Sequence, residues 1–301
     1  MNRIATIPLQ RSMSQAIQQA QGKLATTQLS LATGKKALDY ASLGTETVRN
    51  LSAHTMVSRE EAHSAVATRV GTTLELNDSY LTAMDDSVTS LHTDLLAAIG
   101  TGQSAGLQDA IQAAFDQYRS SLNASEGGVP LFGGAQTSSP FTPTTLADTL
   151  TTPVGQAFTN DQVKATARAA TNLDVEYGIV ASDVGSGLYS AFQTLAAAGT
   201  ITDTLTPAQK TAMEQAASQI EEGLKSLRTV NSSNGRKQAQ VADLGTRADA
   251  RIVSLKDIIS QNEDADLGQV ATDLASQKTV LEASYSVFSQ LSGLTLLNYL
   301  K

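Results

Sequence analysis

The sequence predicts a mainly α protein: a long antiparallel helical rod with coiled-coil terminal helices and a small β-containing inserted outer domain. Three observations predict it. Apolar residues recur at alternating three- and four-residue steps near both ends of the chain. Aromatic residues make up only 4% of the chain and tryptophan is absent, a composition that favours helix over a compact core. The helical spacing is lost between about 125 and 205, where four of the six prolines lie.

Both ends of the chain carry a heptad stripe that an isolated helix would leave exposed to water. In 1–38 the stripe steps through Ile17, Leu24 and Leu31, and in 267–297 it starts at Leu267. A short helix is marginal without a partner for its apolar face, so we expect the two ends to pair with each other or with other molecules. The predicted assembly interface consists of Ile17, Leu24, Leu31, Leu267, Val270, Leu274, Leu281, Tyr285, Phe288 and Leu291.

Charge is distributed unevenly between these ends. Residues 1–37 contain five basic residues and no acidic residue, whereas 257–301 contain six acidic residues and only Lys278 and Lys301 as bases. Opposite charges on two candidate partner helices favour their association. The formal net charge of the chain is −8, which argues against nucleic-acid binding because nucleic-acid-binding domains are normally basic.

Three further helices are expected between the terminal stripes. An amphipathic segment covers 46–99, and the glycine-rich 100–106 breaks it and folds a helix at about 107–124 back along its neighbour. Helical patterning resumes at Pro207, a good first-turn residue with Thr206 as N-cap, and continues to about 260. Asn234-Gly235 interrupts this pattern, and we expect a continuous or mildly kinked helix there because helical spacing lies on both sides.

Residues 125–205 have a different character. Prolines, glycines and threonines are frequent, and short runs such as Leu173 to Val180 are bounded by turn residues. This composition predicts a small domain with β character, including a helix at 187–197.

No combination of residues indicates catalysis. His54, His63 and His92 lie on predicted helices at spacings that do not place two metal ligands on one face, and we interpret them as solvated or capping residues. Adjacent carboxylates on a helix point about 100° apart and do not share a site. The glycine-rich segments match neither the P-loop nor the dinucleotide-binding pattern. We therefore expect no enzymatic activity, no cofactor and no metal.

The chain contains no cysteine, so a disulfide framework and a thiolate metal site are excluded. No apolar run approaches the roughly 18 residues of a membrane span, and the first residues lack the apolar core of a secretory signal. If the protein is extracellular, we expect export without a cleaved signal peptide.

Three segments, LSLATGKKALD at 29–39, PLFGGAQTSSPF at 130–141 and ASYSVFSQLSGLTLL at 283–297, resemble segments of the bacterial flagellin superfamily. The first resembles the point at which a terminal helix ends before the next rod domain. The other two favour the hook-associated junction proteins within this superfamily over filament flagellins. The resemblance makes Leu131, Phe132, Gly133 and Gly134 a rod-to-outer-domain hinge.

The resemblance implies an architecture and a role. Residues 1–45 and 260–301 would be terminal helices packing in an inner tube, 46–125 and 205–259 the helical rod domain, and 126–204 the outer inserted domain. The chain would be a structural subunit of the bacterial flagellum at the distal hook–filament junction, outside the cell. Its partners would be further copies in a ring or helical lattice, a neighbouring hook-associated junction protein, flagellin and an export chaperone, with no nucleic acid and no membrane span.

Two alternatives stay open at this point. A filament flagellin shares the terminal pattern, but it would be abundant and would polymerise alone. A flagellin-like cell-surface glycan receptor would keep saturable ligand binding when its outer domain is expressed by itself.

Overall fold

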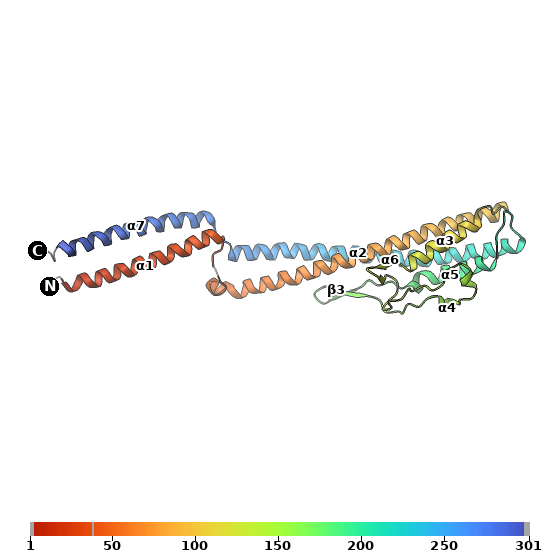
Figure 1. The fold of residues 1–301 in the computed structure, drawn as a ribbon, viewed down its shortest axis with the longest axis horizontal. Helices are drawn as coiled ribbons and strands as arrows, with labels where there is room; N and C mark the ends of the chain where they lie inside the picture. The colour runs from red at the N-terminus through yellow and green to blue at the C-terminus, as the bar shows by residue number, and fades with distance from the viewer. Residues whose placement is uncertain (1–2, 38, 298–301) are drawn as a thin grey trace. The chain divides into compact units, whose positions relative to one another are not determined.

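The computed structural model describes residues 3–37 and 39–297 (Figure 1), without the side chains of 3–7, 9–10 and 291–297. Close contacts divide the chain into two compact units. We call 1–59 with 251–301 the terminal unit and 60–250 the middle unit. The boundary falls within two long helices, α2 (Thr47–Thr101) and α6 (Pro207–Glu263).

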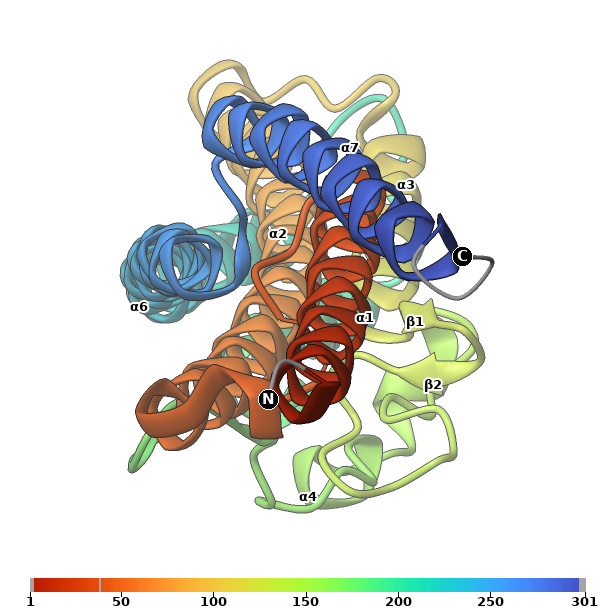
Figure 2. The same cartoon turned by 90° about the vertical axis from the view of Figure 1, so that its left-hand side faces the viewer.

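The terminal unit pairs the two ends of the chain. Helix α1 (Arg3–Thr33) and helix α7 (Leu267–Leu297) run side by side (Figure 1, Figure 2). They are antiparallel, because Gln21 donates a hydrogen bond to the Tyr285 hydroxyl while Lys35 forms a β-bridge with Asp264. A short 3-10 helix, η1 (Ala41–Glu46), leads into α2.

A small apolar cluster joins the start of α2 to the end of α6 within the terminal unit. Ala53, Val57 and Ile259 are buried there, and Ile252 and Leu255 pack against them.

The helices predicted at both ends of the chain, α1 and α7, are present, and they pair with each other.

The middle unit is built on α2 and α6 as an antiparallel pair. Ser64 contacts Asp249 and Leu74 contacts Asn234, so the sequence numbers run in opposite directions along the contact. Helix α3 (Leu107–Leu122) folds back after the glycine-rich break, as predicted.

Helix α6 begins and continues as the sequence predicts. The Thr206 hydroxyl accepts a hydrogen bond from the Gln209 amide at 3.2 Å, and the Gln209 side chain accepts one from the Thr206 amide at 3.1 Å, which is a capping box. The helix runs through Asn234-Gly235 without a break. The side-chain amide of Asn234 donates to the Leu74 carbonyl oxygen at 2.8 Å, so this residue serves the helix pair rather than a turn.

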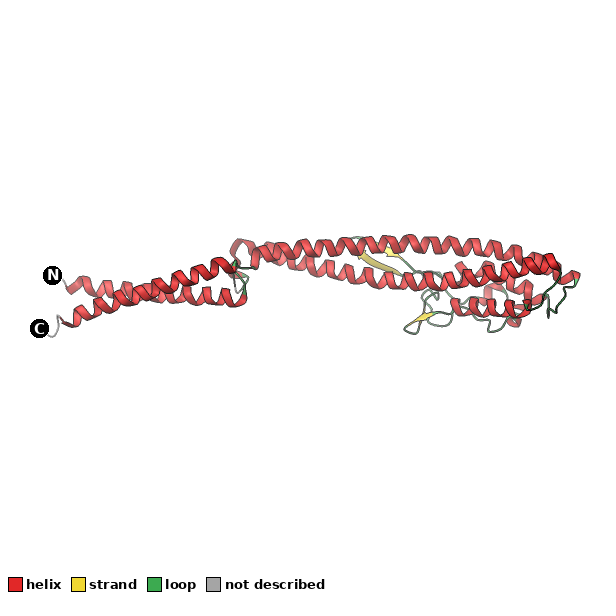
Figure 3. Cartoon of the chain, turned by 90° about the horizontal axis from the view of Figure 1, so that it is seen from above, coloured by secondary structure: helices red, strands yellow, loops and turns green. Residues whose placement is uncertain are grey.

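The segment between α3 and α6 contains the strands (Figure 3). Strands β1 (Ser125–Glu126) and β2 (Val129–Pro130) form one antiparallel sheet, and β3 (Thr166–Ala170) and β4 (Leu173–Glu176) form another. The register of the second sheet pairs Thr166 with Glu176, and an irregularity lies between Arg168 and Ala170. The short helices η2 (Ala147–Leu150) and α4 (Val154–Ala157) lie between the two sheets in sequence.

Helix α5 (Ala181–Ala197) begins earlier than the predicted 187. Gly185 and Gly187 disfavour helix in a sequence, but both lie where other side chains or backbone come close. A Cβ on Gly187 would lie 3.1 Å from the Cα of Gly223 in α6. Tertiary packing of α5 against α6 therefore offsets the poor helix propensity.

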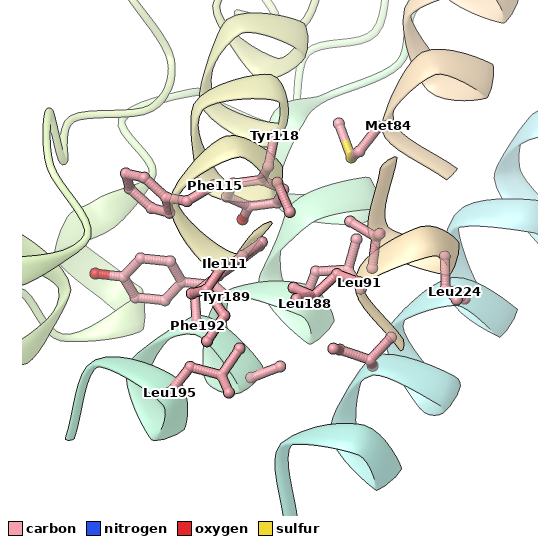
Figure 4. Close-up of a cluster of buried hydrophobic side chains, with 14 of the residues drawn as sticks. Met84, Leu91, Ile111, Phe115, Tyr118, Leu188, Tyr189, Phe192, Leu195 and Leu224 are labelled. Atoms are coloured by element: carbon pink, nitrogen blue, oxygen red, sulfur yellow. The ribbon is translucent and has the colours of Figure 1, made fainter. Parts of the chain in front are cut away.

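The larger hydrophobic core of the middle unit draws on the long helices and on the segment between α3 and α6, which we call the inserted segment (Figure 4). A smaller cluster lies around Leu74, Val175 and Val241. Phe115 of α3 meets Phe192 of α5 edge to face with ring centroids 5.4 Å apart, and Tyr118 of α3 packs against the same ring in a tilted arrangement at 5.0 Å. Phe141 of the inserted segment lies 5.2 Å from Tyr118 and meets it edge to face. The three-part division into terminal, rod and outer domains stays a prediction, and these contacts place the side chains of rod and outer segments in a shared core.

Candidate assembly interface

Pairing α1 with α7 buries little of the predicted apolar stripe. Ile17 is buried, whereas Leu24, Val270, Leu274, Leu281 and Phe288 are half-buried. Leu31, Leu267 and Tyr285 are exposed at 37%, 51% and 45%. The side chain of Leu291 lies outside the described part of the structure.

Further large apolar side chains of the two helices face solvent off the predicted stripe. Leu29, Val280 and Val287 are exposed at 43%, 57% and 46%. Each helix of a pair can bury only one side against its single partner, so residues on its other sides stay in water. The terminal unit therefore presents apolar surface that a further helix could cover.

The chain turns out of α1 at an ionic cluster. Gly34 has φ +69° and its amide donates to the Ser30 carbonyl oxygen at 2.9 Å, a left-handed helix end that glycine adopts readily. The next residue, Lys35, places its ammonium 2.6 Å from the Asp264 carboxylate and 3.1 Å from that of Glu263. Backbone hydrogen bonds also join the segment after α1 to the end of α6 where the two cross. The Lys36 amide donates to the Glu263 carbonyl oxygen at 2.7 Å.

Glu263 is the centre of this cluster. Its Oε1 lies 2.7 Å from His54 Nε2 and accepts a hydrogen bond from Asn50 Nδ2 at 2.6 Å. The contacts with His54, Asn50 and Lys35 lower the pKa of Glu263 to about 2. The Lys35 and Ser260 contacts also lower the pKa of Asp264. We call Lys35, Asn50, His54, Glu263 and Asp264 the polar clamp.

The histidines differ from the sequence interpretation of solvated or capping residues. His63 is buried, with an exposed fraction of 8%, and its Nε2 has no hydrogen-bond partner among the described residues. His54 is half-buried and contacts Glu263 rather than water alone. The contact of His54 comes from α6, which the spacing of residues within α2 does not reveal.

The Leu131–Gly134 segment, at the start of the inserted segment, contacts two other parts of the chain, near Ala181 and near Asp161. Phe132 is fully buried, and its carbonyl oxygen accepts a hydrogen bond from the Ala181 amide at 2.9 Å. Gly134 has φ +67°, and a Cβ there would lie 3.0 Å from the backbone oxygen of Asp161. Its role as a hinge stays a prediction; these contacts fix the path of the backbone there.

The described surface carries several grooves, among them one of about 540 Å³ that is lined by Lys225, Arg228, Arg236 and Glu221. Another of about 650 Å³ lies between α2 and α6 and is lined mainly by small residues such as Ala67, Gly71 and Gly245. Among residues 3–37 and 39–297, histidine and acidic side chains do not gather in threes that could hold a metal ion. In the same part of the chain, each helix is too short or too polar to cross a bilayer.

Comparison with solved structures identifies similar folds. A protein described as flagellar hook-associated from Vibrio parahaemolyticus aligns with a TM-score of 0.62 and 13% identity, covering 72% of this chain and 97% of that one. FlgL of Bacillus cereus aligns with a TM-score of 0.56 and 13% identity over 70% of this chain and 98% of that one. FlgL of Xanthomonas campestris aligns with a TM-score of 0.56 and 14% identity, covering 69% of this chain and 99% of that one. The chain has the fold of flagellar hook-associated proteins.

Sequence comparison gives no such match. No protein-family model matches the chain, and no curated protein matches it. At 13–14% identity the likeness to the hook-associated structures is one of fold.

Within the hook-associated fold, sequence reasoning found the glycine-lysine turn but missed the side chains that Lys35 meets in the polar clamp and their partners. Gly34 and Lys35 belong to the quoted resemblance, whereas Asn50, Glu263 and Asp264 carried no signal of their own. The sequence feature that indicated an ionic contact was the opposite net charge of the two ends. It favours their association but does not identify which residues form the ion pairs.

Proposed function

We propose that the chain is a structural subunit of the bacterial flagellum that forms the distal hook–filament junction, as flagellar hook-associated protein 3 does, and adapts hook to filament. The observation that carries the proposal is the antiparallel pair α1 and α7, which leaves large apolar side chains exposed. The shared fold with hook-associated proteins supports the same role.

The proposed partners follow from this role. Copies of the chain would associate in a ring or helical lattice, with a neighbouring hook-associated junction protein on one side and flagellin on the other. Before assembly, an export chaperone would cover the apolar terminal helices. The protein would reach the flagellum outside the cell without a cleaved signal peptide.

The physical basis of assembly is the burial of apolar surface that one helix pair cannot bury alone. Removing apolar area from water stabilises a complex by about 25 cal/mol per Å². The predicted interface residues, including Leu31, Leu267 and Tyr285, would then lie against helices of neighbouring subunits. This head-to-tail use of two different surfaces suits a ring or helical lattice.

Labelled antibody on isolated flagella tests the location. We expect a single band where hook meets filament. Label along the whole filament would support a filament flagellin instead, and label on the cell surface away from flagella would support a surface receptor.

Substitution of an exposed apolar residue tests the interface. Val280→Asp and Val287→Asp place a carboxylate on surface that is exposed in the isolated chain, so the fold should stay intact while burial in an assembly becomes costly. We expect filaments to be shed from cells that express either variant. The matched control is Lys278→Asp, which changes a charge that is already solvated on the same helix. Normal filament attachment in both valine variants would contradict the proposed interface.

A further inference from the structure

Two helices of the middle unit carry stretches of opposite charge. Residues 70–101 of α2 contain five acidic residues and no lysine or arginine: Glu75, Asp78, Asp85, Asp86 and Asp94. Residues 225–237 of α6 contain four basic residues and no acidic residue: Lys225, Arg228, Arg236 and Lys237. We call Glu75 with Asp86 the acidic edge and Lys225 with Arg236 the basic edge.

Only one ion pair joins these stretches within the described chain. Arg228 binds the Asp85 carboxylate through two hydrogen bonds of 2.7 Å and also donates to the Thr89 hydroxyl at 3.0 Å. The residues of the two edges are exposed and form no ion pair within residues 3–37 and 39–297. Arg236 donates instead to the Ser232 hydroxyl at 3.2 Å. The edges are therefore charged surfaces that the fold of a single copy leaves uncompensated.

The two edges have matching spacing. Glu75 and Asp86 are 11 residues apart, and Lys225 and Arg236 are also 11 apart. Eleven residues make about three helical turns, so each pair lies on one face of its helix with a rise of about 16 Å. One straight neighbour could therefore engage both residues of an edge together.

Contacts between α2 and α6 also place the two edges at matching heights. Asp85 meets Arg228, and the Leu74 carbonyl oxygen accepts hydrogen bonds from Asn234 and Gln238. By this register Asp86 lies level with Lys225, and Glu75 lies level with Arg236.

We propose that the acidic edge of one copy binds the basic edge of a neighbouring copy of the same chain, with Asp86 opposite Lys225 and Glu75 opposite Arg236. The proposal rests on the proposed function, which requires identical copies side by side. In a head-to-tail arrangement two different surfaces of the chain meet, so the acidic edge of one copy can face the basic edge of the next.

Cross-linking between single cysteines tests the contact, because the unmodified chain has no cysteine. Full-length Asp86→Cys and Lys225→Cys chains, one of them with a mass tag, are mixed and treated with a short bis-maleimide. A chain with one cysteine cannot cross-link within itself, so every mixed product reports two copies. The mismatched control is Asp86→Cys with Arg236→Cys. We expect about fivefold more mixed dimer from the matched pair, with the excess lost in high salt. Equal yields from matched and mismatched pairs overturn the proposal.

Charge exchange gives a second, independent readout. The measurement is the weight-average molar mass of the full-length protein in sedimentation at low salt, which rises when copies associate. Asp86→Lys alone and Lys225→Glu alone should each lower this average. Both changes in one chain should restore it, because neighbouring copies again present opposite signs at the same height. The control is Glu75→Lys with Lys225→Glu, which restores the net charge at unmatched heights. Rescue by the control as well as by the matched exchange overturns the specific pairing.

The antibody experiment keeps this proposal separate from the proposed function. A band at the hook end without matched cross-linking leaves the junction role standing and overturns the edge contact. Matched cross-linking with label elsewhere supports the edge contact and overturns the junction role.

Discussion

At the residue scale, Glu263 connects parts of the terminal unit that are more than two hundred positions apart in sequence. Its carboxylate meets Lys35 just after α1 and Asn50 and His54 in α2. Charged hydrogen bonds are stronger than neutral ones, and this side chain is only 18% exposed. One carboxylate therefore fixes where the backbone leaves α1 relative to the start of α2.

Replacing Glu263 by glutamine should loosen the polar clamp. Glutamine keeps the shape of the side chain but loses the charge that attracts Lys35 and His54. We expect amide hydrogen exchange at Lys36 and Ala265 to quicken about tenfold at pH 7, because both amides donate to carbonyl oxygens at this crossing. The control is Glu222→Gln, an exposed glutamate of α6 in the middle unit. Equal exchange in the wild type and Glu263→Gln would contradict this role.

The same carboxylate predicts a pH dependence. Its pKa in the folded chain is about 2, below its ordinary value of 4.5. The unfolded chain therefore binds more protons between these values, and the stabilisation, complete above about pH 4.5, is lost as the pH falls toward 2. The exchange difference between wild type and Glu263→Gln should be constant from pH 7 to about 5 and shrink below that. A difference that grows on acidification would refute the assignment.

At the element scale, α5 and α6 touch through their backbones. A Cβ on Gly223 would lie 2.9 Å from the Leu188 backbone nitrogen and equally close to its Cγ. Leu188 is fully buried, so its side chain has little room to move aside. Glycine at this position therefore sets the distance between the two helices.

Gly223→Ala and Gly235→Ala, on the same helix, should have opposite effects. The first forces α5 from α6 and should lower the free energy of unfolding of the middle unit by about 1–3 kcal/mol. The second meets open space and should raise it by about 0.5–1 kcal/mol through helix propensity. Urea unfolding followed by circular dichroism measures both. Stabilisation by Gly223→Ala would show that α5 does not pack this closely.

At the scale of the whole molecule, the two units have cores of very different size. The buried apolar residues of the terminal unit are few, among them Ile17, Ala53, Val57 and Ile259, whereas the middle unit has a large core with aromatic rings in mutual contact. Since apolar burial supplies most of the stabilisation, the terminal unit has far less to offset its conformational entropy.

The terminal unit should therefore unfold at lower urea than the middle unit. Hydrogen exchange measured by mass spectrometry at increasing urea follows peptides from both units in one sample. Peptides from α1 and α7 should lose protection first, and peptides from α3 and α5 last. Coincident midpoints for all four helices would contradict separate stability of the units.

A second prediction at this scale concerns cooperativity within the middle unit. Phe192→Ala removes a buried ring that packs against Phe115 and Tyr118, and should lower the free energy of unfolding by about 3–5 kcal/mol. Because the core is shared, peptides from α6 and from the inserted segment should shift to lower urea together. Leu150→Ala, at a residue 55% exposed, is the control and should change little. A shift confined to the inserted segment would show that it unfolds as a separate domain.

Much of the helical architecture could be predicted from local patterns. Heptad spacing indicates both terminal helices, and the capping box at Thr206 and the glycine-rich break after α2 mark helix ends through interactions of neighbouring residues. The start of α5 and the environment of His63 could not be predicted this way, because both depend on α6 or α2 approaching from elsewhere in the chain.

The candidate interface also has features that local sequence predicts and features that depend on tertiary contacts. The sequence by itself determined that apolar stripes lie at both ends and that these ends carry opposite charge, since spacing and sign are local properties. Only the tertiary structure decided that most residues of the stripes stay partly or fully exposed after pairing, that Glu263 contacts Lys35, Asn50 and His54, and that rod and inserted segments share a core. Burial and charge pairing depend on which segments meet in space, and periodicity along one helix carries no information about its partner.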